Sequence, residues 1–555
     1  MALEHLEAVA DIGSNAIRFA IYDLSIASAA RNLPLVFQDR AKISLYDALA
    51  SANAGDTNAA ARRVPADVLE RVRQAFCRFD VICGTFGVPP DKVFVFGTEA
   101  ARSATNSAAL LELLRRVNSA WTVTLLSPED EARFGALGIA SSYHEVAGIV
   151  MDLGGGSVQI SWASSMAGKF VTSERAVSLP YGAAALMQRM KLKGSTATLK
   201  AELASALHSA LKKIRPPFST KGASLYLSGG GFRALACVSM AVEMPTTNSD
   251  TESLYAVPIV NGYRSSLKEI EKVVAHTQLS DKFAVKLDDL FRISNRRASQ
   301  LPAIFMLVQA LIAACPQLGS VHFCQGGVKE GYVFSKLDDT IKWKDPLITC
   351  TSIYARPASD KIQTLLSFAL SSFTPVYISK RILPAVVNCL YAQSSYTKDT
   401  QATVALNMAV SGSLAGAYGL THVDRALLGI ILCERWGGDV FDERVLGRLC
   451  DLVVSESSGS VGLSYIFWGY YIAKIATIVA ELFPAGIIDD ENRIKVKALH
   501  DEPDNLVLEL TFRKLDPCRL AIWDTVLSLE KRIKKFRKKY DINRVPIVQF
   551  RFVLV

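Results

Sequence analysis

Two aspartates in this chain are each followed by a glycine-rich turn that could bind an anion through its backbone. The first follows an apolar run that ends at Asp11, and its turn consists of Gly13, Ser14 and Asn15. Because glycine has no Cβ, the N–H groups of such a turn can approach a phosphate closely. The carboxylate beside the turn can hold a cation or a water next to that anion. We therefore predict a strand, a phosphate-binding turn and a return strand over residues 5–24.

The same order of residues occurs a second time. An apolar run ends at Asp152, an alternating segment leads away, and the turn between them is Gly154, Gly155, Gly156 and Ser157. About half of all single turns of this kind are plain hairpin turns without a ligand. Two copies in one chain, however, indicate a duplicated unit. If the two halves face each other across a cleft, both turns can hold one polyphosphate from opposite sides.

Strands that alternate with helices surround both turns. In the first half, hydrophobic spacing predicts helices at 65–84 and 107–118 and strands at 93–96 and 122–126. In the second half it predicts strands at 147–162, 170–179, 224–227 and 321–324, and helices at 182–190, 199–214, 231–238, 260–275 and 301–315. Residues 25–60 and 245–254 are predicted to be mainly loop. Polar motifs at strand ends in an α/β pattern are what a two-domain cleft requires.

The character of the chain changes after about residue 345. Helical periods without strands run from about 355 to 483, and a small α/β unit follows with strands at 494–498, 506–512 and 546–554 and a helix from about 519. We therefore divide the chain into four parts: residues 1–136, 137–344, 345–485 and 486–555.

Composition and net charge argue against several classes of protein. The 555 residues carry a formal charge of +9, which suits an anionic ligand or an acidic partner but is too weak and scattered for direct nucleic-acid binding. The ten cysteines include no Cys-x-x-Cys pair, which favours a reduced intracellular protein, and no signal peptide is evident, so we expect the cytoplasm. The apolar run Val461–Phe483 contains Lys474 and Glu481, which favours a buried helix over a membrane span.

Several motifs in a fixed order resemble the exopolyphosphatase/guanosine pentaphosphate phosphohydrolase family. They are Asp11–Phe19, Thr98–Arg102, Leu126–Arg133, Asp152–Ile160, Ser178–Gly182, Ser228–Gly231, Arg297–Ala303 and Gly327–Gly331. The resemblance implies an α/β fold of the actin/Hsp70/sugar-kinase superfamily, with two ribonuclease H-like domains around a cleft. It also implies a helical domain like the metal-dependent HD phosphohydrolases, followed by the small α/β unit. The stretches Gly419–Leu428 and Glu434–Gly438 resemble the fungal branch of this family, which acts in retrograde regulation.

The resemblance also assigns roles to residues of the cleft. Glu131 aligns with the catalytic glutamate of the family, and Arg18 and Arg102 would lie near the phosphates. Asp11 and Asp152 would hold Mg²⁺ through oxygen or water ligands. Gly229 and Gly230 belong to a loop that resembles the adenosine side of the superfamily's cleft, although a strand-to-helix turn without a ligand is the alternative.

From the residues alone, Glu131 is an acid near a helix start, where it would complement the dipole. Glu129 and Asp130 could serve that purpose equally well, and only the resemblance singles out Glu131. The basic run Lys531–Lys539 is predicted to be a solvated helix face with Ile533 and Phe536 turned inward. An acidic partner, polyphosphate or a nuclear-import receptor is the alternative for that run.

Some positions depart from the enzyme pattern. Gln159 stands where the family's second phosphate motif has a glutamate, Ala185 stands near a usual arginine, and Lys329 replaces an arginine. Lysine keeps the charge of arginine but loses its bidentate fork. The helical domain offers His422 without the set of histidines and aspartates that an HD metal site needs, so we expect a structural or interface residue there.

A chain that keeps both phosphate turns but has altered charged residues around them fits a phosphate-binding sensor. The resemblance to the fungal branch implies a cytoplasmic regulator of mitochondria-to-nucleus retrograde signalling that acts by binding a regulatory protein. We expect its cleft to bind ATP or another polyphosphate, with Mg²⁺. The alternative is an active exopolyphosphatase or nucleotide phosphohydrolase that uses Glu131 and Mg²⁺. A third possibility is a scaffold whose cleft is a relic. We expect no membrane contact, and the resemblance implies that a homodimer can form.

Overall fold

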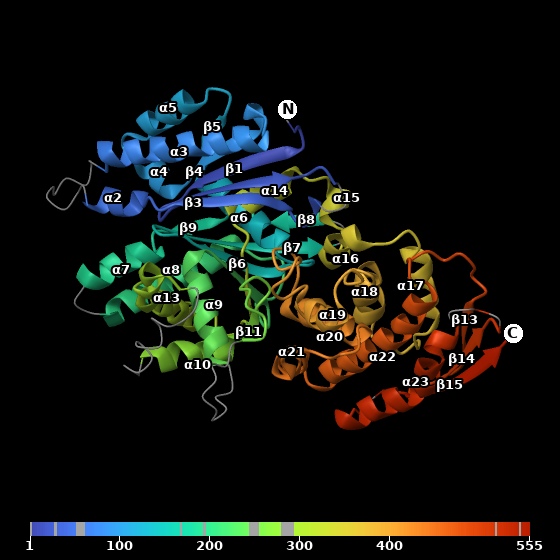
Figure 1. Cartoon of the computed structure of the whole chain (residues 1–555). Coiled ribbons are helices and arrows are strands. Elements are labelled where there is room, and N and C mark those ends of the chain that lie inside the picture. The colour runs from blue at the N-terminus through green and yellow to red at the C-terminus, as the bar shows by residue number, and fades with distance from the viewer. Residues whose placement is uncertain are drawn as a thin grey trace. The chain divides into compact units, whose positions relative to one another are not determined.

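The computed structural model describes residues 3–26, 30–51, 62–166, 169–192, 196–243, 255–278, 293–514, 516, 519–542 and 545–555. These residues form two compact units (Figure 1). The first comprises residues 1–253 and 260–344, and the second comprises residues 254–259 and 345–555. Each unit is described by itself below.

The first unit begins with a five-stranded sheet in the order β3-β2-β1-β4-β5. Its strands are β1 (Leu6–Ile12), β2 (Ile17–Asp23), β3 (Leu35–Ala41), β4 (Val93–Gly97) and β5 (Thr122–Leu125). The first three strands are antiparallel neighbours, whereas β4 and β5 run parallel to β1. β1 is buried along its whole length, as its continuous apolar run predicts.

A second sheet in the same unit repeats this order. Its path is β11-β12-β10-β6-β7-β8, and β9 pairs with β7. Its strands are β6 (Ala147–Leu153), β7 (Val158–Met166), β8 (Lys169–Thr172), β9 (Val177–Leu179), β10 (Ser224–Ser228), β11 (Arg264–Ser266) and β12 (Ser320–Phe323). Reading β8-β7-β6-β10-β12 gives the 3-2-1-4-5 order of the first sheet, with the same parallel and antiparallel pairs. The duplication and the two ribonuclease H-like halves are therefore confirmed.

Helices cover both sheets of the first unit (Figure 1). In the first half they are α2 (Leu45–Ser51), α3 (Ala66–Phe86), α4 (Glu99–Ser103), α5 (Ser107–Val117) and α6 (Pro128–Ser141). In the second half they are α7 (Ala183–Leu192), α8 (Thr196–Ile214), α9 (Gly230–Val242), α10 (Leu267–Gln278), α12 (Asn295–Ala298), α13 (Leu301–Ala314), α14 (Val328–Lys336) and α15 (Asp339–Lys342). The apolar stripe of α3 packs on the first sheet, where Phe79 stacks on Phe19 with ring centroids 4.5 Å apart.

The helices α6 and α14 cross in close contact because glycines lie at the crossing. A Cβ at Gly331 would lie 1.8 Å from the carbonyl oxygen of Phe134, and one at Gly138 would lie 2.2 Å from the carbonyl oxygen of Gly327. No larger residue fits at either position without separating the helices. This crossing joins α6, which carries Glu131, to the end of the second half.

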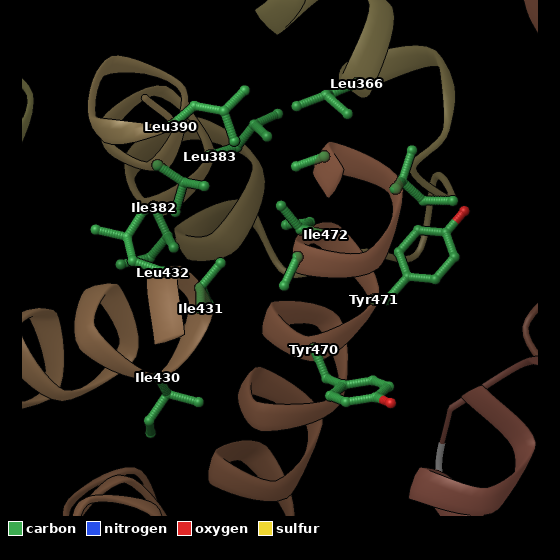
Figure 2. Close-up of a cluster of buried hydrophobic side chains, with 14 of the residues drawn as sticks. Leu366, Ile382, Leu383, Leu390, Ile430, Ile431, Leu432, Tyr470, Tyr471 and Ile472 are labelled. Atoms are coloured by element: carbon green, nitrogen blue, oxygen red, sulfur yellow. The ribbon is translucent and has the colours of Figure 1, made fainter. Parts of the chain in front are cut away.

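The second unit is built mainly from helices. They are α16 (Pro346–Thr351), α17 (Ser359–Phe368), α18 (Leu383–Cys389), α19 (Lys398–Asn407), α20 (His422–Arg435), α21 (Glu443–Glu456) and α22 (Ser460–Leu482). A π-helical turn at Ile378–Ile382 precedes α18. Figure 2 shows apolar side chains of these helices, among them Ile382, Ile431 and Ile472, converging on one core. α22 is long and apolar enough to cross a membrane by length and composition, and 72% of its most apolar window is buried within the structure.

A three-stranded sheet in the order β13-β14-β15 completes the second unit. Its elements are β13 (Ile494–Asp501), β14 (Asn505–Phe512), α23 (Arg519–Lys539) and β15 (Ile547–Leu554). On α23, Ile533 is buried, and Phe536 stacks on Tyr470 of α22 with ring centroids 3.8 Å apart. The inward orientation of these two residues is therefore confirmed.

A short segment inserted in the sequence of the first unit belongs to the core of the second. Val257 is fully buried among the apolar side chains of the helical unit. The carbonyl oxygen of Ile259 lies 2.7 Å from Nε2 of His422, at the start of α20. His422 is itself fully buried, and burial lowers its pKa to about 3, so the ring is neutral. His422 thus has a structural role, as predicted.

The secondary structure differs from prediction in two places. In the described part of residues 25–60 the chain forms β3 and α2, where a loop with a short element was predicted, because β3 is an edge strand whose partly exposed polar side chains hide the strand pattern. The helix predicted at 260–275 begins only at Leu267, because Gly262 turns the chain at a φ of 87° and β11 follows. The loop predicted at 245–254 lies outside the described residues.

Candidate functional site

The two predicted phosphate turns have the same geometry. In the β1–β2 hairpin the N–H of Gly13 donates to the carbonyl of Ala16 at 3.2 Å, and in the β6–β7 hairpin that of Gly154 donates to Ser157 at 2.9 Å. Each aspartate lies directly opposite a residue of the return strand, so Asp11 faces Arg18 and Asp152 faces Gln159. Arg18 and Gln159 therefore occupy equivalent positions in the two halves.

Both turns line one cavity of about 100 Å³ in the first unit. The predicted residues at its wall are Asp11, Gly13, Ser14, Asn15, Arg18, Glu131, Asp152, Gly154, Gly155, Ser157, Gly229 and Gly230. Two predicted residues, Arg102 and Gly156, lie behind this wall: Arg102 contacts Glu131, and Gly156 is covered by Glu99. The structure thus brings the two halves of the predicted site together.

Residues of the first half pack against the second turn, which explains two of its glycines, Gly155 and Gly156. A Cβ at Gly155 would lie 2.7 Å from Nδ2 of Asn15, and a Cβ at Gly156 would lie 2.2 Å from Oε2 of Glu99. The hydroxyl of Ser14 donates to that same Glu99 oxygen at 3.2 Å. Side chains of the first half therefore pack directly on the backbone of the second turn, and only glycine leaves room for them.

The two aspartates fit the place of a divalent cation. Asp11 is buried, and its Oδ1 has no hydrogen-bond partner among the residues that the structure describes. Burial raises the pKa of Asp11, and burial together with the nearby Asp11 charge raises the pKa of Asp152 to about 6, against the effect of Arg18. A cation between the two carboxylates would relieve this cost. Mg²⁺ commonly takes only one or two protein carboxylates and completes its shell with water and phosphate oxygens.

Glu131 is the one acid of the α6 start that faces the cavity. Asp130 instead pairs with the capping residue Ser127, whose hydroxyl accepts from the N–H of Asp130 at 3.0 Å and donates to its Oδ2 at 3.0 Å. Glu131 Oε2 accepts from Arg102 Nη1 at 3.0 Å, and Oε1 accepts from Gln159 Nε2 at 3.3 Å. Burial raises the pKa of Glu131 to about 7, although the Arg102 charge opposes this shift. A carboxylate with this pKa can take and return a proton near neutral pH.

Four arginines line the cavity: Arg18, Arg40, Arg296 and Arg297. Burial lowers the pKa of Arg297 to about 10, and the positive charges of Arg233, Arg18 and Arg40 add to this effect. Burial and the neighbouring arginines likewise lower the pKa of Arg40. Cations that repel one another in this way would be stabilised by a ligand with several negative charges.

Sequence reasoning found only Arg18 of these four. Arg40 lies on the edge strand that was expected to be loop, so no motif marked it. Arg297 opens the segment Arg297–Ala303 that resembles a family motif, and Arg296 precedes it. This pair of adjacent cations before an apolar helix was the available signal. Lys329, which departs from the family pattern, is buried and pairs with Glu330 at 3.1 Å instead of lining the cavity.

The loop at Gly229 and Gly230 joins β10 to α9 beneath the second turn. Gly229 has a φ of 100°, and a Cβ there would lie 2.3 Å from the carbonyl oxygen of Leu153. Gly230 lies beside Arg297, whose Nε would be 3.7 Å from a Cβ at that position. Gly229 therefore has a packing role, whereas a Cβ would fit at Gly230, and the guanidinium of Arg297 lies beside the loop that was predicted to approach adenosine.

The duplicated 3-2-1-4-5 sheets and the paired phosphate turns define the class of protein. The model of the Ppx/GppA phosphatase family matches residues 25–340, and this chain belongs to that family. Residues 345–544 match the RTG2 C-terminal domain. The chain is similar to Retrograde regulation protein 2 of Saccharomyces cerevisiae, with 33% identity over 98% of this chain and 96% of that protein.

Solved structures of the same family are also similar. A Ppx/GppA family member of Aquifex aeolicus is 22% identical, with a TM-score of 0.45 over 60% of this chain and 97% of its own. An exopolyphosphatase of Cytophaga hutchinsonii is 17% identical, with a TM-score of 0.45 over 60% of this chain and 98% of its own.

Proposed function

We propose that this protein is a regulator in retrograde signalling whose cleft binds the phosphates of a polyphosphate or nucleotide. The observation that carries the proposal is the joining of both phosphate turns and four arginines in one cavity. The similarity to Retrograde regulation protein 2 over almost the whole chain supports the regulatory role. Ligand binding would favour one arrangement of the two halves of the first unit, because both halves contribute groups to the cavity.

The regulatory output would be protein binding in the cytoplasm. A ligand can shift the protein between two states only by as much as it binds one state better than the other. Groups from two halves that close on one polyanion provide such a difference. We propose that a cytoplasmic regulatory protein binds one of these two states, and that a homodimer is a further state to test.

Hydrolysis of a phosphoanhydride is the second candidate function, and Glu131 favours it. Its pKa of about 7 suits a general base, and Asp11 and Asp152 could hold Mg²⁺, which when bound would neutralise developing phosphate charge. Arg102 and Gln159, however, donate to both carboxylate oxygens of Glu131. The Arg102 hydrogen bond and charge stabilise the charged carboxylate, which lowers its affinity for a proton taken from water. This arrangement favours binding over fast turnover.

The proposal can be tested with the full chain. Binding of inorganic triphosphate and of ATP, each with Mg²⁺, is measured by calorimetry while phosphate release is followed in parallel. Wild type is compared with Glu131→Gln, and Gly155→Val serves as the control that fills the space of Asn15. We expect binding that Gly155→Val abolishes and that Glu131→Gln retains, with little phosphate release. Absence of binding by both ligands would overturn the proposal, and fast release that vanishes in Glu131→Gln would establish the hydrolase instead.

A further inference from the structure

The start of α2 is attached to the first phosphate turn. The carbonyl oxygen of Ser14 accepts from the hydroxyl of Ser44 at 3.1 Å and from the backbone N–H of Tyr46 at 3.0 Å. The N–H of Asp47 in turn donates to the Ser44 hydroxyl at 3.2 Å. The turn and the first residues of α2 therefore move together.

Arg296 reaches this assembly from α12 in the other half of the unit. Its Nη2 donates to Oδ1 of Asn15 at 2.8 Å and to the hydroxyl of Ser44 at 3.0 Å, and it lies 2.7 Å from Oδ2 of Asp47. Arg296 lines the cavity beside Arg297, whereas Asp47 does not line it. One guanidinium thus faces the ligand cavity and an acidic side chain outside that cavity.

We infer that Asp47 competes with ligand phosphate for Arg296, so that a ligand gains this arginine only by displacing Asp47. The inference rests on the proposed polyphosphate binding and assigns a competing role to one ion pair of that site. It makes Asp47 an internal substitute for a phosphate group. It also makes the release of Asp47 by Arg296 a consequence of ligand binding.

The relative strengths of the two interactions support the exchange. The side chains of Arg296 and Asp47 are 38% and 55% exposed, and an ion pair this exposed contributes little to stability because water and salt screen it. A phosphate that also contacts the turns and the other arginines presents more charge in a less exposed place, and arginine binds phosphate through two parallel hydrogen bonds. The exchange is therefore favourable for a phosphate that is bound in the cavity.

A second bridge between the same elements provides a control. The hydroxyl of Tyr46 donates to Oε1 of Gln188 on α7 at 3.1 Å. This bond also joins α2 to the other half, but it involves no cation that a phosphate could bind. Its loss would loosen the contact without freeing an arginine.

The test compares the two partners of the ion pair in the full chain. Binding of inorganic pyrophosphate and of inorganic triphosphate, each with Mg²⁺, is measured by calorimetry for wild type, Asp47→Asn, Arg296→Ala and Tyr46→Phe. If Asp47 competes, Asp47→Asn tightens triphosphate binding by up to about fivefold, the factor that an exposed ion pair is worth. Arg296→Ala weakens triphosphate binding about tenfold or more.

Opposite effects of the two substitutions are the decisive result, because a pair that merely held the halves together would give effects of the same sign. Effects of the same sign, or a gain in Tyr46→Phe equal to that in Asp47→Asn, would overturn the inference while triphosphate still binds. Failure of wild type to bind either phosphate would instead overturn the proposed function and this inference with it.

Discussion

Glu131 makes the stability of the first unit depend on pH, and Glu131→Gln should remove that dependence. The Glu131 side chain is buried, with 8% of the residue exposed, and burial raises its pKa from 4.5 to about 7. The folded protein therefore binds the proton of Glu131 more tightly than the unfolded chain does. The stabilisation is fully present below pH 4.5 and is lost as the pH rises through about 7.

The size of the effect follows from the pKa. A rise from 4.5 to about 7 corresponds to a loss of about 3 kcal/mol in the free energy of unfolding between acidic and mildly basic pH. Glutamine at position 131 cannot ionise, yet it retains an oxygen for the guanidinium of Arg102. We therefore expect Glu131→Gln to be more stable than wild type at pH 8 by up to about 3 kcal/mol, and to lose that advantage at pH 4.5.

Thermal unfolding of the ligand-free full chain checks this expectation. Melting temperatures of wild type and Glu131→Gln are compared across pH 4.5 to 8 without Mg²⁺, and about 3 kcal/mol corresponds to several degrees. Glu129→Gln, which removes the same charge from an exposed position of the same helical turn, is the matched control. A difference between wild type and Glu131→Gln that is constant over this range would refute the reasoning, as would an equal change in Glu129→Gln.

Three further substitutions test other parts of the site. Gln159→Glu places a second carboxylate near Glu131, where two charges about 4 Å apart repel by about 4 kcal/mol at an effective dielectric constant of 20. The melting temperature of the ligand-free protein at pH 8 should therefore fall, and the rise in melting temperature that Mg²⁺ causes should become larger. Gly156→Ala drives a Cβ into Glu99, so triphosphate affinity by calorimetry should fall about tenfold or more while the helix content by circular dichroism is unchanged. Gly331→Ala separates α14 from α6 and should cost about 3 kcal/mol or more, seen as a lower melting temperature or as loss of soluble protein.

The phosphate turns could be predicted because their signal is local. An apolar run, an aspartate and a glycine turn are contiguous in sequence, and the same pattern occurs twice, so Asp11 and Asp152 were found without any knowledge of tertiary structure. Glu131 was chosen only by resemblance, since three acids stand together at the start of α6. What distinguishes Glu131 is its burial against Arg102 and Gln159, which depends on contacts between distant segments.

The arginines of the cavity show the limit of this reasoning. Arg40 comes from an edge strand and Arg296 from a helix of four residues, and neither element has a clear hydrophobic period. Their convergence on one cavity depends on contacts between distant segments, and no pattern within one segment encodes it. The helical part was easier to predict, because its long apolar periods alone exclude strands from residues 355–483.

The buried segment around Val257 has a practical consequence for anyone who produces parts of this protein. The family match for the C-terminal region begins at residue 345, and a recombinant fragment cut there would lack this segment. The helical unit would then contain a void in place of Val257, and Nε2 of His422 would lose the carbonyl of Ile259. A gene fragment that starts at residue 345 therefore encodes an incomplete core, and supplying residues 255–259 as a peptide or through a designed linker should restore its solubility.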